Sequence, residues 1–203
     1  MIAVTPVREP KTFGTTARTP GGNWLKAHPN AKRPKDLWSP HLAALASGFA
    51  GRCAYAAMLD PTGGTVDHYL SFKNRPDLAY EWTNYRFASQ PLNASKRTAD
   101  AAVLDPYEVK AGWFEIILPS LQLQVTSAVP SKVRPRAEYT LKRLKLRHGE
   151  RIIRWRQAWY QQFLEGHLTL EGLRDFAPLI AEAVERAQPP RSKPKRKARR
   201  ARR

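Results

Sequence analysis

The 203-residue chain carries 35 Lys and Arg against 17 Asp and Glu, a formal net charge of +18. A field this positive favours phosphate-bearing polymers or an anionic membrane surface as partners. Hydrophobic content of 42% with six Trp supports a packed core and excludes a disordered polycation. The single cysteine, Cys53, excludes an intramolecular disulfide framework and a zinc cage built from cysteines. The lack of a long apolar run or a signal pattern predicts a soluble, cytoplasmic protein with no membrane partner.

The positive charge is divided between the end of the chain and the rest of it. Nine basic residues lie within residues 189–203, which contain no acid: Arg191, Lys193, Lys195, Arg196, Lys197, Arg199, Arg200, Arg202 and Arg203. Residues 1–188 hold the other 26 Lys and Arg against 17 Asp and Glu, so they still carry +9. We expect the tail to bind polyanions nonspecifically and with strong salt dependence. A nuclear-import signal at Lys195-Arg196-Lys197 is the alternative interpretation.

Residues 1–40 are rich in Pro, Thr, Gly and Lys and show no sustained hydrophobic period. This composition predicts an extended arm, pinned to the body by Trp24, Leu25 and Trp38.

The middle of the chain alternates short elements with turns. An Ala-rich helix is expected from Pro40, with Gly48 and Gly51 marking its end. The Asp60–Gly64 stretch, with its Pro and two Gly, predicts a turn. The remaining expected elements are a strand at Thr65–Leu70, a loop at Lys73–Asp77, a strand or helix at Leu78–Phe87, a short helix at Leu92–Thr98 and two strands within residues 104–130.

After Pro135 the hydrophobic period becomes helical. Three helices are expected, one through Tyr139–Leu146, one through Ile152–Leu164 and a third over Leu168–Ala187. Residues 189–203 are expected to be disordered without a partner.

Three short stretches carry candidate chemistry. They are Val66-Asp67-His68-Tyr69, Tyr80-Glu81-Trp82-Thr83-Asn84-Tyr85 and Leu92-Asn93-Ala94-Ser95-Lys96. Fifteen residues lie between His68 and Asn84, and eight lie between Asn84 and Asn93. With the Cys-Ala-Tyr stretch before the turn, this pattern resembles the HNH endonuclease family over roughly residues 52–98.

The resemblance implies an α+β fold built on a ββα-metal HNH core. The implied organisation is an N-terminal arm (1–40), an HNH nuclease domain (41–130), a helical region packed on the core (131–188) and a disordered basic tail (189–203). The implied activity is metal-dependent hydrolysis of phosphodiester bonds in DNA.

The resemblance also assigns roles to individual residues. His68 becomes the general base, which suits an imidazole that is largely neutral at working pH. Asp67 becomes a ligand of a divalent metal, Mg²⁺ or alternatively Mn²⁺, because hard cations prefer oxygen ligands. Asn93 becomes the second ligand through its amide oxygen, and Asn84 braces the loop and orients the His68 ring. Asp67 and His68 are neighbours on a strand, so their side chains should face opposite sides.

Many members of this family hold a structural zinc with two Cys-x-x-Cys pairs, which this chain lacks. Only Cys53 and Ala56 stand at the first pair, and Ala88-Ser89-Gln90-Pro91 contains no cysteine. We therefore expect no structural zinc, and packing by Tyr55, Trp82, Tyr85 and Phe87 in its place. Asn93 also departs from the family, in which His is the commonest residue at this position.

Basic residues concentrate in Lys132–Arg156, which holds ten Lys and Arg against Glu138 and Glu150. A solvated helix face is the usual explanation of such a run. Its density beside a nuclease-like motif favours contact with a nucleic-acid backbone. The nucleic-acid-binding candidates are Lys96, Arg143, Lys145, Arg147, Arg151, Arg154, Lys195, Arg196 and Lys197.

Three classes of function remain open at the level of sequence. A metal-dependent HNH endonuclease is the leading one. By analogy within the family, it resembles nuclease subunits of bacterial anti-phage (antiviral defence) systems that work beside an ATPase partner, such as the Septu type. A catalytically degenerate nucleic-acid-binding accessory subunit is the alternative. A ribosome- or RNA-associated basic protein would explain the charge but gives no reason for the Asp67-His68, Asn84 and Asn93 spacing.

Overall fold

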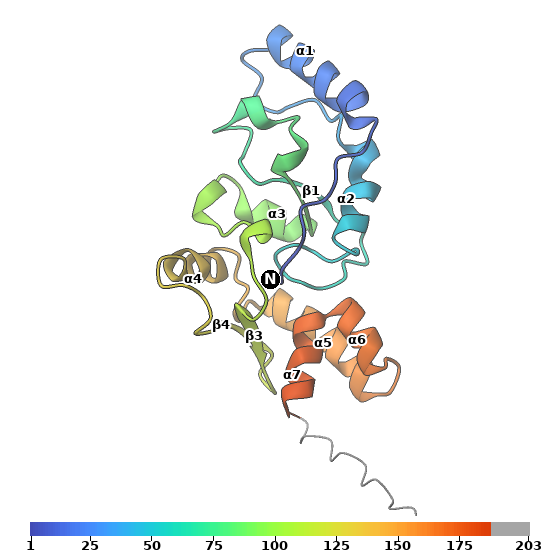
Figure 1. Cartoon of the computed structure of the whole chain (residues 1–203), viewed down its shortest axis with the longest axis vertical. Coiled ribbons are helices and arrows are strands. Elements are labelled where there is room, and N and C mark those ends of the chain that lie inside the picture. Colours follow the sequence, from blue (N-terminus) through green and yellow to red (C-terminus); the bar gives the residue numbers. More distant parts are fainter. Residues whose placement is uncertain (188–203) are drawn as a thin grey trace, which may run out of the picture.

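The computed structural model describes residues 1–187 (Figure 1) and has an α+β architecture. The basic-tail candidates Lys195, Arg196 and Lys197 lie outside the described residues. The helices are α1 (Thr19–Ala27), α2 (Leu42–Gly48), α3 (Gln90–Lys96), α4 (Arg134–Arg143), α5 (Glu150–Leu164), α6 (Leu170–Phe176) and α7 (Pro178–Ala187). The strands are β1 (Thr65–His68), β2 (Tyr85–Ala88), β3 (Phe114–Ile117) and β4 (Gln122–Val125).

Strands β1 and β2 pair antiparallel at the centre of the molecule, and α3 follows β2 and contacts β1. The register places His68 opposite Tyr85 and Asp67 opposite Arg86. Gly64 ends the turn before β1 with a φ of +58°, and a Cβ there would lie 2.4 Å from the Phe87 ring. Glycine is therefore needed at this turn both for its backbone conformation and for the space it leaves.

Aromatic packing surrounds this small sheet. The side chains of Tyr55, Trp82, Tyr85 and Phe87 are all buried, as the sequence predicts. Phe13 from the N-terminal segment inserts between them, with its ring centroid 5.2 Å from that of Trp82. Edge-on aromatic contacts of this kind add to the stabilisation from area burial, typically by about 1 kcal/mol per pair.

The expectation that residues 1–40 form only an extended arm is wrong. A π-helical turn at Gly14–Arg18 continues into α1, so this segment is helical for between three and four turns. Gly21 explains why: a Cβ there would lie 2.2 Å from the Tyr80 ring, so the helix packs directly on that ring. Two glycines make α1 a weak helix in isolation, and tertiary packing overrides that propensity.

The β3–β4 hairpin packs against α4 and α7 rather than against the central sheet. One hydrophobic core joins Leu123 of this hairpin to Leu141, Ile152 and Ile180 of the helices, so packing is continuous across residue 130. Figure 1 shows α5, α6 and α7 grouped beside β3 at the C-terminal end of the described chain.

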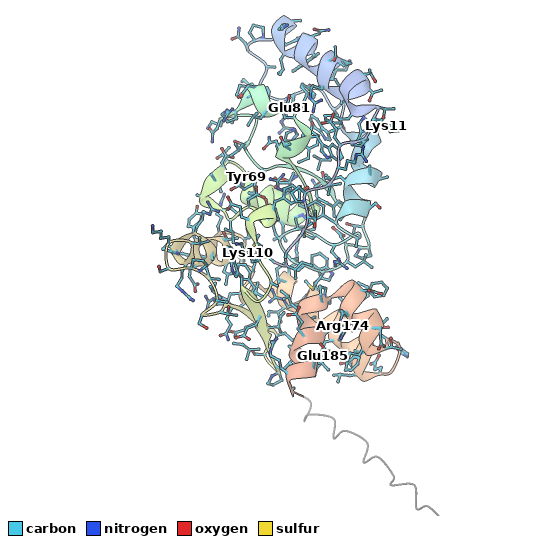
Figure 2. The ribbon with its side chains drawn as sticks, in the orientation of Figure 1. Lys11, Tyr69, Glu81, Lys110, Arg174 and Glu185 are labelled. Carbon is cyan, nitrogen blue, oxygen red and sulfur yellow. The ribbon has the colours of Figure 1, made fainter. Side chains whose placement is uncertain are left out.

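The single helix expected over Leu168–Ala187 is in fact two helices. Ala177 leaves the helical conformation between α6 and α7, with φ −147° and ψ +67°, and α7 begins at Pro178. Proline has no N–H and its ring clashes with the preceding turn, so the helix ends before it. An Arg174–Glu185 ion pair connects the two short helices (Figure 2).

Among residues 1–187, no helix combines the length and the apolar character that crossing a lipid bilayer requires.

Candidate active site

His68 ends β1, and its ring is held by backbone and aromatic neighbours. Its Nε2–H donates to the carbonyl of Ala79 at 2.8 Å. The Tyr85 hydroxyl donates to the same carbonyl at 2.7 Å. Trp38 presents an edge to the imidazole, with ring centroids 4.7 Å apart, which confirms that Trp38 pins its segment to the body.

This environment sets the protonation state of His68. Burial lowers the pKa of His68 by penalising the charged imidazolium, and the Ala79 carbonyl partly offsets that penalty. Because Nε2 must carry the proton that it donates to a carbonyl, the neutral ring has its lone pair on Nδ1. His68 is therefore a neutral imidazole at pH 7 with a defined basic nitrogen.

Asn84 braces the loop that follows β1. Its Oδ1 accepts from the Leu70 N–H at 2.8 Å, and its Nδ2 donates to the carbonyls of Leu70 and Leu78 at 2.9 and 3.2 Å. Leu78 precedes Ala79, whose carbonyl holds the imidazole. Asn84 thus acts on His68 through the loop backbone.

Asp67 lies on the opposite side of β1 from His68, and both of its carboxylate oxygens have partners. Lys96 Nζ donates to Oδ1 at 2.8 Å, and the Tyr55 hydroxyl donates to Oδ2 at 2.6 Å. The side chains of Asp67 and Lys96 are each 1% exposed. The carboxylate is therefore neutralised and closed off by protein groups.

The residues present do not fit the divalent metal that the resemblance implies. A metal ligand needs an accessible oxygen, and the Asp67 oxygens are taken by an ammonium and a phenol. Within residues 1–187, no group of three or more His, Cys, Asp or Glu is placed to hold a metal ion. A metal at Asp67 would require the Lys96 ion pair to open.

Lys96 and Asn93 both face β1 from α3. Asn93 Nδ2 donates to the Val66 carbonyl at 3.2 Å, which ties α3 to the strand. Lys96 Nζ donates to the His68 carbonyl at 2.8 Å in addition to its ion pair with Asp67. The expectation that Lys96 meets a phosphate is wrong, because its ammonium is buried and bonded to the Asp67 carboxylate and the His68 carbonyl.

Tyr55 and the Ala79 carbonyl are functional neighbours that sequence reasoning missed. Tyr55 was expected only to pack, yet burial and the Asp67 charge raise its pKa well above the ordinary value, so it stays a hydrogen-bond donor. A backbone carbonyl has no sequence signature. A tyrosine shortly before an Asp-His strand was the one available signal.

Cys53 and Ser89 meet where the family's zinc cysteines would stand. Burial raises the pKa of the Cys53 thiol, and its sulfur accepts from the Ser89 N–H at 3.3 Å. Ala56 is buried beside them. Side-chain packing and these weak hydrogen bonds connect the two segments.

The basic candidates of the C-terminal region fall into two groups. Arg147 pairs with Glu138 at 2.5 Å and Arg154 with Glu150 at 2.5 Å. Arg143 donates to the Lys96 carbonyl at 3.3 Å. Lys145 and Arg151 are exposed, form no ion pair within the described chain, and line a cleft of about 770 Å³ between α3 and α5.

Comparisons of the chain with protein-family models, with curated proteins and with solved structures found no match. The resemblance to HNH endonucleases stays a prediction carried by Asp67, His68, Asn84 and Asn93.

Proposed function

We propose that the chain is an endonuclease that hydrolyses phosphodiester bonds in DNA, with His68 as the general base. The observation that carries the proposal is the His68 ring, which is neutral, fixed by Nε2–H to Ala79, and basic at Nδ1. The sequence resemblance and the net charge of +18 support a nucleic-acid substrate.

The proposed step is direct hydrolysis. A water oxygen attacks phosphorus while His68 Nδ1 takes one water proton, and the bond from phosphorus to the sugar oxygen breaks. The leaving sugar oxygen takes the bonding electron pair and is protonated by solvent water, and the His68 imidazolium then returns its proton to solvent. Asn84 and the Ala79 carbonyl hold the ring so that Nδ1 keeps its direction. Lys96 occupies the Asp67 carboxylate, so Asp67 takes no part in this step.

The test is nicking of supercoiled plasmid by the purified chain with Mg²⁺ or Mn²⁺. We expect His68→Ala to abolish nicking, because it removes the base. His148→Ala is the matched control, since His148 is exposed and outside the motif. Equal nicking by wild type and His68→Ala, with both proteins folded by circular dichroism, would contradict the proposal.

A second candidate function is a nucleic-acid-binding accessory subunit without catalysis. The closed Asp67–Lys96 pair favours it, because a carboxylate held in this way does not need a metal partner. This candidate predicts binding that falls steeply with salt and no cleavage with any divalent cation.

The family resemblance alone supports two further parts of the proposal. They are a role in antiviral defence beside an ATPase partner and a location in the cytoplasm. Co-purification from the native host tests for the partner. A chain that elutes alone and cuts constitutively would contradict control by a partner.

A further inference from the structure

A basic cleft lies between the end of α1 and the loop after β1. It encloses about 710 Å³, and its lining includes Lys26, His28 and Lys32 from one segment and Lys73 and Asp77 from the other. Figure 1 shows the C-terminal end of α1 beside the segment that carries residues 72–78. Two parts of the sequence that lie about 45 positions apart thus form one surface.

The positive charge of this cleft is available to solvent. Lys26, Lys32 and Lys73 are exposed, and none of them forms an ion pair with any residue of the described chain. The one acid in the lining, Asp77, is held by Arg75 through two hydrogen bonds of 2.8 and 2.6 Å. Arg75 therefore neutralises Asp77, and the lysines set the sign of the cleft.

Basic residues continue along the same segment beyond the lining. Arg33 and Lys35 are exposed, and residues 26–35 contain no acid. A run of unpaired cations along an open cleft is the electrostatic complement of a nucleic-acid backbone.

Each of the two segments that line the cleft continues along the chain to a residue that contacts His68. The 26–35 segment leads to Trp38, whose ring edge contacts the imidazole, and the Lys35 carbonyl accepts from the Tyr80 hydroxyl at 2.8 Å. The other segment follows β1 and continues to Ala79, whose carbonyl accepts the hydrogen bond from His68 Nε2–H. The cleft is therefore formed by the same two segments that hold the His68 ring.

We propose that this cleft binds the phosphate backbone of duplex DNA and leads it toward His68. Lys26, Lys32 and Lys73 are the phosphate contacts. The inference rests on the proposed function for its purpose, but binding can be measured apart from cleavage.

The test uses the full chain, a fluorescently labelled DNA duplex and fluorescence anisotropy in EDTA, so that no cleavage interferes. The variant is Lys26→Ala/Lys32→Ala/Lys73→Ala. The matched control is Arg8→Ala/Lys11→Ala/Lys110→Ala, which removes the same charge from exposed basic residues that form no ion pair within residues 1–187 and lie outside both the cleft and the Lys132–Arg156 region. Lys11 precedes the helical segment whose far end carries Lys26, and Lys110 lies near β3 (Figure 2).

Three phosphate contacts contribute about 2.7 to the slope of log affinity against log salt. When the salt concentration rises from about 50 to about 200 mM, both proteins lose affinity for the duplex. We expect the fold-loss of the cleft variant to be about 40 times smaller than that of wild type. The control should keep a slope close to that of wild type. Equal slopes for the two triple variants would overturn the inference, because the loss would then reflect net charge alone.

Two further arms separate this inference from its alternatives. RNA and single-stranded DNA of matched length are measured beside the duplex, and a cleft variant that weakens only those two would overturn the assignment to duplex DNA. The cleft variant could also bind DNA with unchanged affinity and keep its full His68-dependent nicking. That result would overturn the inference about the cleft and leave the proposed endonuclease standing. Cleft-dependent binding without nicking under any metal would leave the inference standing and contradict the proposed endonuclease.

Discussion

Two basic regions of this molecule use their charge in opposite ways. The C-terminal region Lys132–Arg156 has ten Lys and Arg, and six of them are engaged within the fold. Three of these six form ion pairs, namely Arg136, Arg147 and Arg154. The other three donate to backbone carbonyls, namely Arg134, Arg143 and Arg156. The shorter 26–35 segment has four, and no ion pair involves any of them within the described chain.

A count of basic residues therefore does not measure the charge that a ligand meets. A guanidinium paired with a carboxylate contributes little to the external field and must lose its partner before it binds a phosphate. An exposed lysine without a partner binds a phosphate without first breaking an ion pair, and its binding releases counterions condensed on the DNA. The less basic stretch of sequence is therefore the better candidate for contact with DNA.

The largest expected effect concerns Lys96, a cation wholly committed to the fold. Lys96→Met leaves the buried Asp67 carboxylate without its counter-charge, which typically costs about 3–5 kcal/mol of unfolding free energy. Denaturant unfolding measures this cost. Lys145→Met, at an exposed lysine, is the control and should stay within about 0.5 kcal/mol of wild type.

The double variant Asp67→Asn/Lys96→Met tests whether the two buried charges stabilise the fold as a pair. It removes both charges, so we expect a smaller loss of stability than Lys96→Met alone causes. A double variant as unstable as the sum of the single variants would show that the two side chains are not coupled.

Arg156 gives the next largest expected effect. Its side chain is buried and donates to the carbonyls of Leu121 and Leu146 at 2.8 and 2.7 Å, and burial lowers its pKa to about 10. Arg156→Met removes partners from buried carbonyls at a cost of about 1–3 kcal/mol each. Thermal unfolding should show a clear decrease in Tm, whereas Arg151→Met at an exposed position should not.

The smallest expected effect separates paired from unpaired arginines on α5. Arg154→Ala removes an exposed pair with Glu150 and should change stability by about 0.3–0.5 kcal/mol. If α5 also contacts DNA, Arg151→Ala should reduce the salt slope by about 1 and Arg154→Ala by less. Equal reductions would mean that the Glu150 pair does not withhold Arg154 from the phosphate.

The sequence predicted the central elements well because their signals are local. Pro40, Gly48 and Pro91 bounded helices by their backbone preferences, and the turn before β1 followed from Pro61 and two glycines. Failures came where a contact far along the chain decided the outcome. The helix over Gly14–Ala27 depends on Gly21 against Tyr80, which no local pattern indicates. Pro178 is a local signal for the end of a helix, but the continuous hydrophobic period over Leu168–Ala187 favoured the prediction of a single helix.

Turn chemistry and hydrophobic periodicity act over a few residues, so the α+β composition, the order of the short elements and the place of Asp67 and His68 on a strand follow from local patterns in the chain. The ionic and hydrogen-bonding state of these two side chains depends on contacts that only the folded chain makes. Tyr55 and Lys96, 12 and 29 positions away from Asp67, close its carboxylate. Whether a charge is buried, paired or open to solvent depends on which distant residues meet it, and the net charge of +18 contains no such information.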